Sequence, residues 1–224
     1  MSVRPALRSL SACGRGSGAL PRRLLLGGAA ALGGAAALGG CSLLPHTAYV
    51  RRTVWPLDVR RPVVLAPRVR GKVLLVRDLT PGPGLDQRGV QWLRADGSLH
   101  VDFYNQWAVP PAEGISDDLR RWLVGSGLFA AVVGPDSGLA ADLVLEGELT
   151  AFLGDPARRQ ARAALALVLI GARGSPARVL MQRTVAAQAP LAAATPAGIV
   201  AALLAALGRV LAGTEGAVQR FAAG

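Results

Sequence analysis

An apolar run near the amino terminus determines which part of this chain can belong to a folded domain. Residues 24–38 are Leu, Ala and Gly, and the residues before them include five arginines and no acid. A helix of this length, rising about 1.5 Å per residue, reaches roughly 22 Å, which is short of the ~30 Å hydrocarbon core of a bilayer. A basic start and a short apolar run are typical of a cleaved export signal. We therefore expect residues 1–40 to be a signal peptide, and the fold to form from the rest of the chain.

The apolar run ends in Leu38-Gly39-Gly40-Cys41. This stretch resembles the lipobox of bacterial lipoproteins, in which small residues precede a cysteine that receives a diacylglyceryl group. A deprotonated thiol is nucleophilic enough for that reaction. The resemblance implies cleavage between Gly40 and Cys41 and lipidation of Cys41, and two or three acyl chains would hold the protein durably on a membrane. Ser42 stands where inner-membrane lipoproteins of enteric bacteria often carry Asp, which implies the outer membrane as the destination.

The arginines before Cys41 affect both the predicted export route and the net charge of the mature chain. Arg22 and Arg23 resemble a twin-arginine signal, so that pathway and Sec both stay open as export routes. The whole chain has a formal charge of +11, but five of its 25 basic residues and none of its 14 acids precede Cys41, which leaves about +6. The remaining arginines are scattered and lack interleaved aromatic residues, so we expect no nucleic-acid partner.

The mature chain divides by composition into a tether and a domain. Residues 41–70 contain four prolines and no sustained periodicity, which predicts a lipidated, Pro-rich tether. Residues 71–224 are long enough to bury a core, and we expect them to form a single periplasmic domain. Cys13 lies in the leader, so the mature domain is expected to fold without a disulfide.

Alternation of apolar and polar residues predicts the strands of this domain. In residues 142–150, leucines occupy one side and three acids the other, a period of two that is typical of a half-buried strand. Asp96-Gly97 between two alternating segments predicts an antiparallel hairpin over 90–104, after which the chain is expected to leave the sheet. Further strands are predicted over residues 72–76, 128–133, 161–170 and 178–188.

A spacing of three and four residues predicts two helices. The apolar residues of 112–124 recur on one helical face. Thr195-Pro196, a side-chain cap before a proline, opens a second helix with an apolar stripe that continues towards Phe221. Strands with two helices predict an α+β fold, a two-layer domain with a mostly antiparallel sheet and two helices packed on one face.

Catalytic and metal-binding constellations are not apparent in the sequence. His46 and His100 have no second ligand at metal spacing. Asp117 and Asp118 are adjacent, so they point to different helix positions and are interpreted as first-turn charges rather than an acid and base pair. We expect no catalytic residue, no bound metal and no cofactor, and therefore no enzyme activity.

A longer pattern resembles a known family. Phe103-Tyr104-Asn105-Gln106-Trp107-Ala108-Val109-Pro110-Pro111 precedes the first helix, Ser126-Gly127-Leu128-Phe129 follows it, and Ala141-Asp142 opens a later strand. This order resembles the ABC-type transport auxiliary lipoproteins, which are similar to paraquat-inducible protein C and accompany MCE-domain (mammalian cell entry) lipid transporters. The resemblance spans residues 73–221. It departs from the family pattern near the anchor, where Tyr49-Val50-Arg51 stands in place of an early Tyr-x-Leu strand.

The resemblance implies a function by contact. The protein would dock with an MCE-domain protein and, indirectly, with the permease and ATPase of an ABC transporter that carries phospholipid across the envelope. Trp107, with Pro110 and Pro111, is the candidate partner-binding surface, and the alternative is that Trp107 closes the core. Two other functions stay open. One is an assembly or regulatory lipoprotein that binds a periplasmic enzyme or peptidoglycan, and the other is a domain that carries lipid in an internal pocket.

Overall fold

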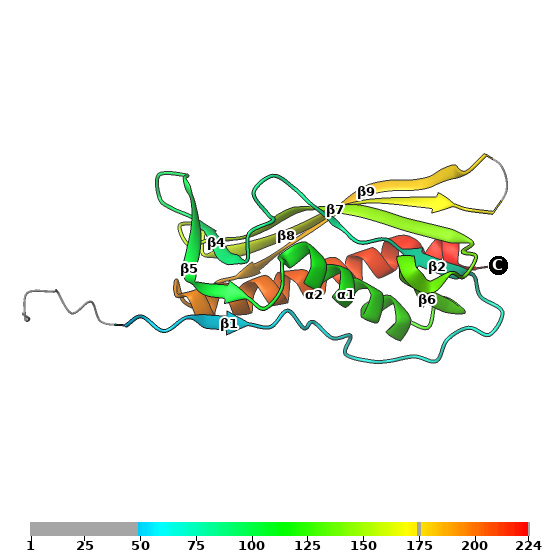
Figure 1. Ribbon diagram of the computed structural model, residues 1–224, viewed down its shortest axis with the longest axis horizontal. Coiled ribbons are helices and arrows are strands. Elements are labelled where there is room, and N and C mark those ends of the chain that lie inside the picture. Colours follow the sequence, from blue (N-terminus) through cyan, green and yellow to red (C-terminus); the bar gives the residue numbers. More distant parts are fainter. Residues whose placement is uncertain (1–48, 174–175, 224) are drawn as a thin grey trace, which may run out of the picture. The chain divides into compact units, whose positions relative to one another are not determined.

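The computed structural model describes residues 49–173 and 176–223, which form a nine-stranded sheet and two long helices (Figure 1). The expected signal peptide and the residues of its predicted cleavage site, Gly40 and Cys41, lie outside the described residues. The strands are β1 (Thr53–Trp55), β2 (Val73–Val76), β3 (Thr80–Pro81), β4 (Gly89–Leu93), β5 (Leu99–Trp107), β6 (Ala131–Val133), β7 (Leu143–Asp155), β8 (Gln160–Gly171) and β9 (Arg178–Pro190). The helices are α1 (Pro111–Gly125) and α2 (Pro196–Ala222), with a short 3-10 turn, η1 (Pro135–Ser137), between β6 and β7.

The sheet is mixed, which corrects the prediction that it is mostly antiparallel. The pairs β4–β5, β7–β8 and β8–β9 are antiparallel, and the last two form the longest ladders. The other five pairings in the described residues are parallel, and they join β1 to β5, β2 to β6 and β7, and β7 to β3 and β4. Antiparallel hairpins join neighbours in sequence through recognisable turns, whereas the parallel pairs join distant segments that no local turn marks.

The core lies between the long strands and the helices. Every second residue of β8 is almost completely buried, namely Ala161, Ala163, Leu165, Leu167 and Leu169. The leucines of β7 at 143, 145 and 149 face the same way, as their alternation predicted. Figure 1 places both helices beneath the long strands β7, β8 and β9. The predicted α+β class is therefore confirmed.

Both helices begin where the sequence predicted. Pro111 is the first residue of α1, and the chain turns away from its end at Gly127, which has a φ of +65° that favours glycine. Thr195 caps α2 by accepting a hydrogen bond of 3.2 Å from the N–H of Gly198. By length and composition α2 could cross a membrane, but half of its most apolar window is buried in the fold. Its apolar side packs on β8 and β9 as a core helix.

The segment predicted as the end of the tether is part of the folded unit, which begins at Tyr49. Residues 53–55 form β1 beside the last three residues of β5. The chain was predicted to leave the sheet after Tyr104, but β5 continues to Trp107. Leu57 is buried, and the extended chain then crosses α1 before it enters β2. The prolines that suggested a free tether instead keep this packed segment extended.

Candidate interaction surfaces

Trp107, the predicted anchor for a partner, lies in the core. Its side chain is 1% exposed, and its ring centroid is 5.3 Å from that of Phe152. Pro110 is the half-buried N-cap of α1, and Pro111 is buried as the first helical residue. Contrary to the docking hypothesis, the ring of Trp107 offers no face to a partner. The Trp-Pro-Pro motif joins β5 to α1 and closes one part of the core.

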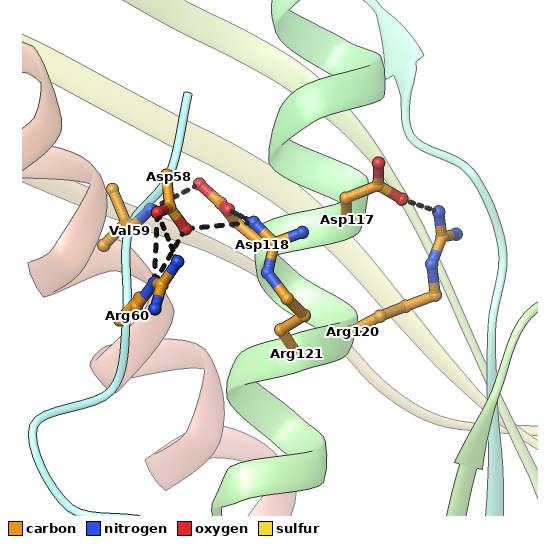
Figure 2. Close-up of polar contacts among 7 residues, drawn as sticks. All are labelled: Asp58, Val59, Arg60, Asp117, Asp118, Arg120 and Arg121. Carbon is orange, nitrogen blue, oxygen red and sulfur yellow. Dashed lines mark hydrogen bonds and ion pairs between the residues drawn. The ribbon is translucent and has the colours of Figure 1, made fainter. Parts of the chain in front are cut away.

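Residues 57–70, here called the strap, are fixed to α1 by a buried carboxylate (Figure 2). The backbone N–H of Val59 donates a hydrogen bond of 3.0 Å to Oδ2 of Asp118. Asp118 is fully buried, and it also accepts a hydrogen bond from Arg121, which approaches Asp58 of the strap at 3.5 Å. Burial raises the pKa of Asp118, although the Val59 N–H and the Arg121 charge act in the opposite direction.

The two adjacent aspartates of α1 serve different neighbours. Figure 2 shows Asp118 turned towards the strap and Asp117 turned away from it. Asp117 pairs with Arg120, whose guanidinium also binds Asp78 at 2.7 Å. Each carboxylate is engaged by a different arginine, so the two side chains belong to separate ion pairs. Both lie in the second turn of α1, which begins at Pro111, so the prediction that they are first-turn charges is wrong.

A second clamp ties the strap to both helices through Glu215. Arg61 of the strap donates two hydrogen bonds of 3.0 Å, one to each carboxylate oxygen of Glu215 on α2. The indole N–H of Trp122 on α1 donates a third, at 2.8 Å. The hydrogen bonds from Arg61 are the main reason that the pKa of Glu215 is lowered, and Trp122 adds to the effect. Paired, two-pronged hydrogen bonds of this kind fix orientation as well as distance.

Between its anchors the strap turns large aliphatic side chains outward. Val63 is 61% exposed, Val64 is 76% exposed, and Leu65 is half exposed. The backbone beneath them is held, since the N–H of Leu65 donates a 2.9 Å hydrogen bond to the carbonyl of Gly125 at the end of α1. Val63, Val64 and Leu65 are here called the valine patch. Contiguous exposed apolar side chains on a fixed backbone are typical of an interaction site.

An apolar groove of about 560 Å³ adjoins the valine patch. It is open to solvent and lies between the strap and the two helices. Its apolar walls include Val59, Val63, Trp122, Ala205, Gly208 and Ala212.

A second exposed surface comes from an irregularity in β5. The pairing of β5 with β4 shifts register at residues 102–105, here called the aromatic bulge. The buried carboxylate of Asp102 accepts hydrogen bonds from the N–H groups of Tyr104 and Asn105 and from the Asn105 side chain, at 2.7, 3.1 and 2.8 Å. Phe103 and Tyr104 both face solvent as an edge-to-face pair with centroids 5.2 Å apart. The Arg52 guanidinium lies over the Phe103 ring, 4.7 Å from its centroid.

Two more polar side chains noted in the sequence, those of His100 and Glu146, contact neighbouring side chains, whereas His46 lies outside the described residues. His100 stacks on Trp92 and contacts Arg94, and Glu146 pairs with Arg77 at 3.2 Å. Across residues 49–173 and 176–223, no group of three His, Cys, Asp or Glu side chains is placed to hold a metal ion.

The comparison with protein families decides the family of the chain. The model of a family described as "ABC-type transport auxiliary lipoprotein component" matches residues 57–213. The chain belongs to this family. The resemblance found in the sequence is thereby confirmed. The match covers the strap, every strand of the sheet except β1, α1 and most of α2, so the valine patch and the aromatic bulge lie within the matched residues. Members of this family are lipoproteins of the bacterial envelope associated with ABC-type transport.

Solved structures share the fold of this family member. Protein XCC0632 from Xanthomonas campestris, assigned to the family DUF330, is 24% identical, with a TM-score of 0.66 over 75% of this chain and 95% of that one. A second structure, of an uncharacterized protein, is 16% identical, with a TM-score of 0.58 over 75% of this chain and 99% of that one. None of the curated proteins compared with the chain matches it.

Neither candidate surface of this family member was predicted from the sequence. The valine patch lies in the segment interpreted as tether, because prolines obscured its role. The aromatic bulge overlaps the start of the motif that carried the family resemblance, but the predicted anchor in that motif was Trp107. The available signal was Phe103-Tyr104, two large aromatics in succession in a strand, which strict alternation cannot place on one face.

Proposed function

We propose that this auxiliary lipoprotein acts without catalysis in an MCE-associated ABC system that transports phospholipid across the bacterial envelope. In this proposal Cys41 is acylated after the leader is cleaved. The domain then sits on the periplasmic face of the outer membrane, where it docks with an MCE-domain protein and, through it, with the permease and ATPase. Family membership and the lipobox support the anchor and the association with an ABC transporter.

The observation that carries the docking role is the valine patch. Three large aliphatic side chains in succession are exposed, although Asp118 and Glu215 fix the strap beneath them. Because the backbone is already ordered, a partner that covers the patch gains apolar burial without ordering the strap first. A rigid, apolar surface of this kind suits a protein that works by contact.

Co-purification from native membranes tests this role. Val63→Asp with Val64→Asp places two charges in the patch, and we expect the full-length lipoprotein to lose its capture of the MCE-domain protein. Leu139→Asp, at an exposed leucine after η1, is the matched control and should leave capture unchanged. Undiminished capture by the Val63 and Val64 variant would refute docking through this patch.

Acylation is tested separately with labelled fatty acid in the host. The wild-type chain should take up label and Cys41→Ser should not. An unlabelled wild-type protein that keeps its leader would remove the proposed location and the transporter role together.

The apolar groove supports a second candidate, a domain that itself carries lipid. Its apolar walls suit an acyl chain. Arg60 and Arg209 line it as well, where Arg60 pairs with Asp58 and Arg209 donates a hydrogen bond to the carbonyl of Gln188. Lipid recovered by mass spectrometry from the purified protein, and absent from an Ala205→Trp variant that fills the groove, would favour this function. Protein free of lipid that still captures the transporter would favour docking.

A further inference from the structure

The aromatic bulge lies where the chain enters the folded unit. Arg52, just before β1, stacks on Phe103, so the entering segment and the bulge are in direct contact. Tyr49 and Val50, three and two residues earlier, are 90% and 52% exposed. Seven residues lie between Cys41 and Tyr49, and the eight steps from one to the other span at most roughly 28 Å in an extended chain. If Cys41 is acylated, the bulge is therefore confined to the neighbourhood of the bilayer.

The charge of the entering segment suits a phospholipid surface. Arg51 and Arg52 are its basic residues, and no acid occurs between Cys41 and Asp58. Two acids, Asp86 and the Asp102 of the bulge, line a hollow with Phe103 and Arg88. Arg51, Arg52 and Arg88 thus stand against two carboxylates. The local balance thus stays basic, which favours anionic headgroups.

The buried carboxylate of Asp102 also holds the backbone in the conformation that exposes the two aromatic rings. In a regular strand, Phe103 and Tyr104 would point to opposite faces. Asp102 is 9% exposed and accepts three hydrogen bonds that hold the bulge, and as a result both rings face solvent. Scattered exposed apolar residues are ordinary, but a fixed pair of adjacent aromatics beside an arginine is the composition that membrane interfaces favour.

We propose that the aromatic bulge, with Tyr49, Arg51 and Arg52, is a bilayer-contact surface that orients the anchored domain. The rings of Phe103 and Tyr104 lie among the lipid headgroups, and the two arginines pair with anionic phosphates. This surface rests on the acylation of Cys41 proposed above. It adds a second attachment next to the lipid anchor, so the domain does not tumble freely on its linker but presents one fixed face to the periplasm.

Site-specific quenching in vesicles tests the contact. The acylated full-length protein, after leader removal, has Cys41 blocked by lipid, so Val101→Cys introduces a unique thiol beside the intact rings. The probe is an environment-sensitive fluorophore on that thiol, in vesicles of phosphatidylethanolamine and phosphatidylglycerol that contain a nitroxide-labelled lipid. We expect strong quenching at position 101. Leu139→Cys, an exposed leucine in the loop after η1, is the matched control and should not be quenched.

Two further variants identify which side chains make the contact. Phe103→Ser with Tyr104→Ser should lower quenching at position 101 to the level at position 139. Arg51→Gln with Arg52→Gln should lower it in vesicles that contain phosphatidylglycerol and have little effect in phosphatidylcholine alone. Equal quenching at positions 101 and 139, or quenching that survives loss of both rings, would overturn the inference.

The proposed acylation of Cys41 and the proposed contact surface can be disproved separately. A chain that is acylated and floats with the vesicles, yet shows no quenching at position 101, overturns only the contact surface. A chain that carries no acyl group overturns the proposed anchor and this inference with it.

Discussion

The backbone N–H of Val59 donates its hydrogen bond to the carboxylate of Asp118, 59 residues later in the chain, at 3.0 Å. This contact joins a segment without regular structure to a helix whose position is set by the core. The carboxylate is fully buried, so its ionised form loses solvation that one backbone hydrogen bond and one arginine only partly replace. The contact therefore makes stability depend on pH.

Replacing Asp118 by Asn tests that dependence. Since burial raises the pKa of Asp118 above 3.8, the folded protein binds more protons than the unfolded chain just above that value. The contribution of Asp118 to the free energy of unfolding is fully present below the pKa that this group has in the unfolded chain. It is lost as pH rises through the pKa that the group has in the folded protein. Asp118→Asn keeps an oxygen that can accept from Val59 and removes this loss. We expect the variant to gain stability relative to wild type as pH rises from acidic to neutral, measured by urea unfolding at a series of pH values; a difference that is constant with pH would contradict the argument.

Glu215 is expected to behave in the opposite way. Its pKa lies below 4.5, so its contribution is present above that pH and is lost as pH falls through the lowered folded pKa. Glu215→Gln removes the charged partner of Arg61, and we expect it to cost about 1.5–3 kcal/mol near neutral pH, the usual range for hydrogen bonds to charged groups. Urea unfolding followed by far-UV circular dichroism measures the loss. Glu148→Gln, a partly exposed residue of β7, is the control and should change stability little.

The local elements of the fold were predictable from the sequence because their signals are local. The alternation in residues 142–150, the Asp96-Gly97 turn and the Thr195-Pro196 cap each act within a few residues, and each appears in the structure as predicted. These patterns fix the elements, but they carry no information on which distant strands become neighbours.

The candidate surfaces depend on contacts between distant residues and could not be predicted in the same way. Arg61 and Glu215 meet across 154 positions, and nothing in either local pattern links them. The parallel pairing of β1 with β5 has the same origin, since it joins Thr53 to Asn105 without a turn. The burial of Trp107 likewise depends on Phe152, a residue of another strand that packs against its ring.

Trp107 and Phe103 belong to one sequence motif but are expected to respond differently to truncation. Trp107→Ala empties a fully buried site, and removal of a buried aromatic of this size costs about 3–5 kcal/mol. Phe103→Ala removes a ring that is 62% exposed, so we expect a loss of at most about 0.5 kcal/mol. Urea denaturation of the two variants gives the comparison. Similar losses for both would mean that the bulge contributes to the core, against its placement on the surface.

Gly89, on β4, faces the aromatic bulge and leaves no room for a side chain. A Cβ placed there would lie 2.5 Å from both the carbonyl oxygen of Asp102 and Cγ1 of Val101. The carbonyl belongs to the backbone of the bulge, so it cannot give way without shifting the bulge itself. We expect Gly89→Ala to destabilise the protein by about 1–3 kcal/mol, as overpacking does, and to alter the exposure of Phe103.

Gly216→Ala is the matched control for that substitution. Gly216 lies within α2 with no atom near the added methyl group, so alanine should stabilise the helix by about 0.5–1 kcal/mol. Thermal unfolding of both variants measures whether each substitution raises or lowers stability. The labelling rate of a cysteine at position 103, introduced into each variant, measures the exposure of that position in the bulge. If Gly89→Ala matched Gly216→Ala in stability and left the labelling rate unchanged, close packing of β4 against the bulge would not be what holds Phe103 and Tyr104 outward. The hydrogen bonds of Asp102 would then have to hold them alone.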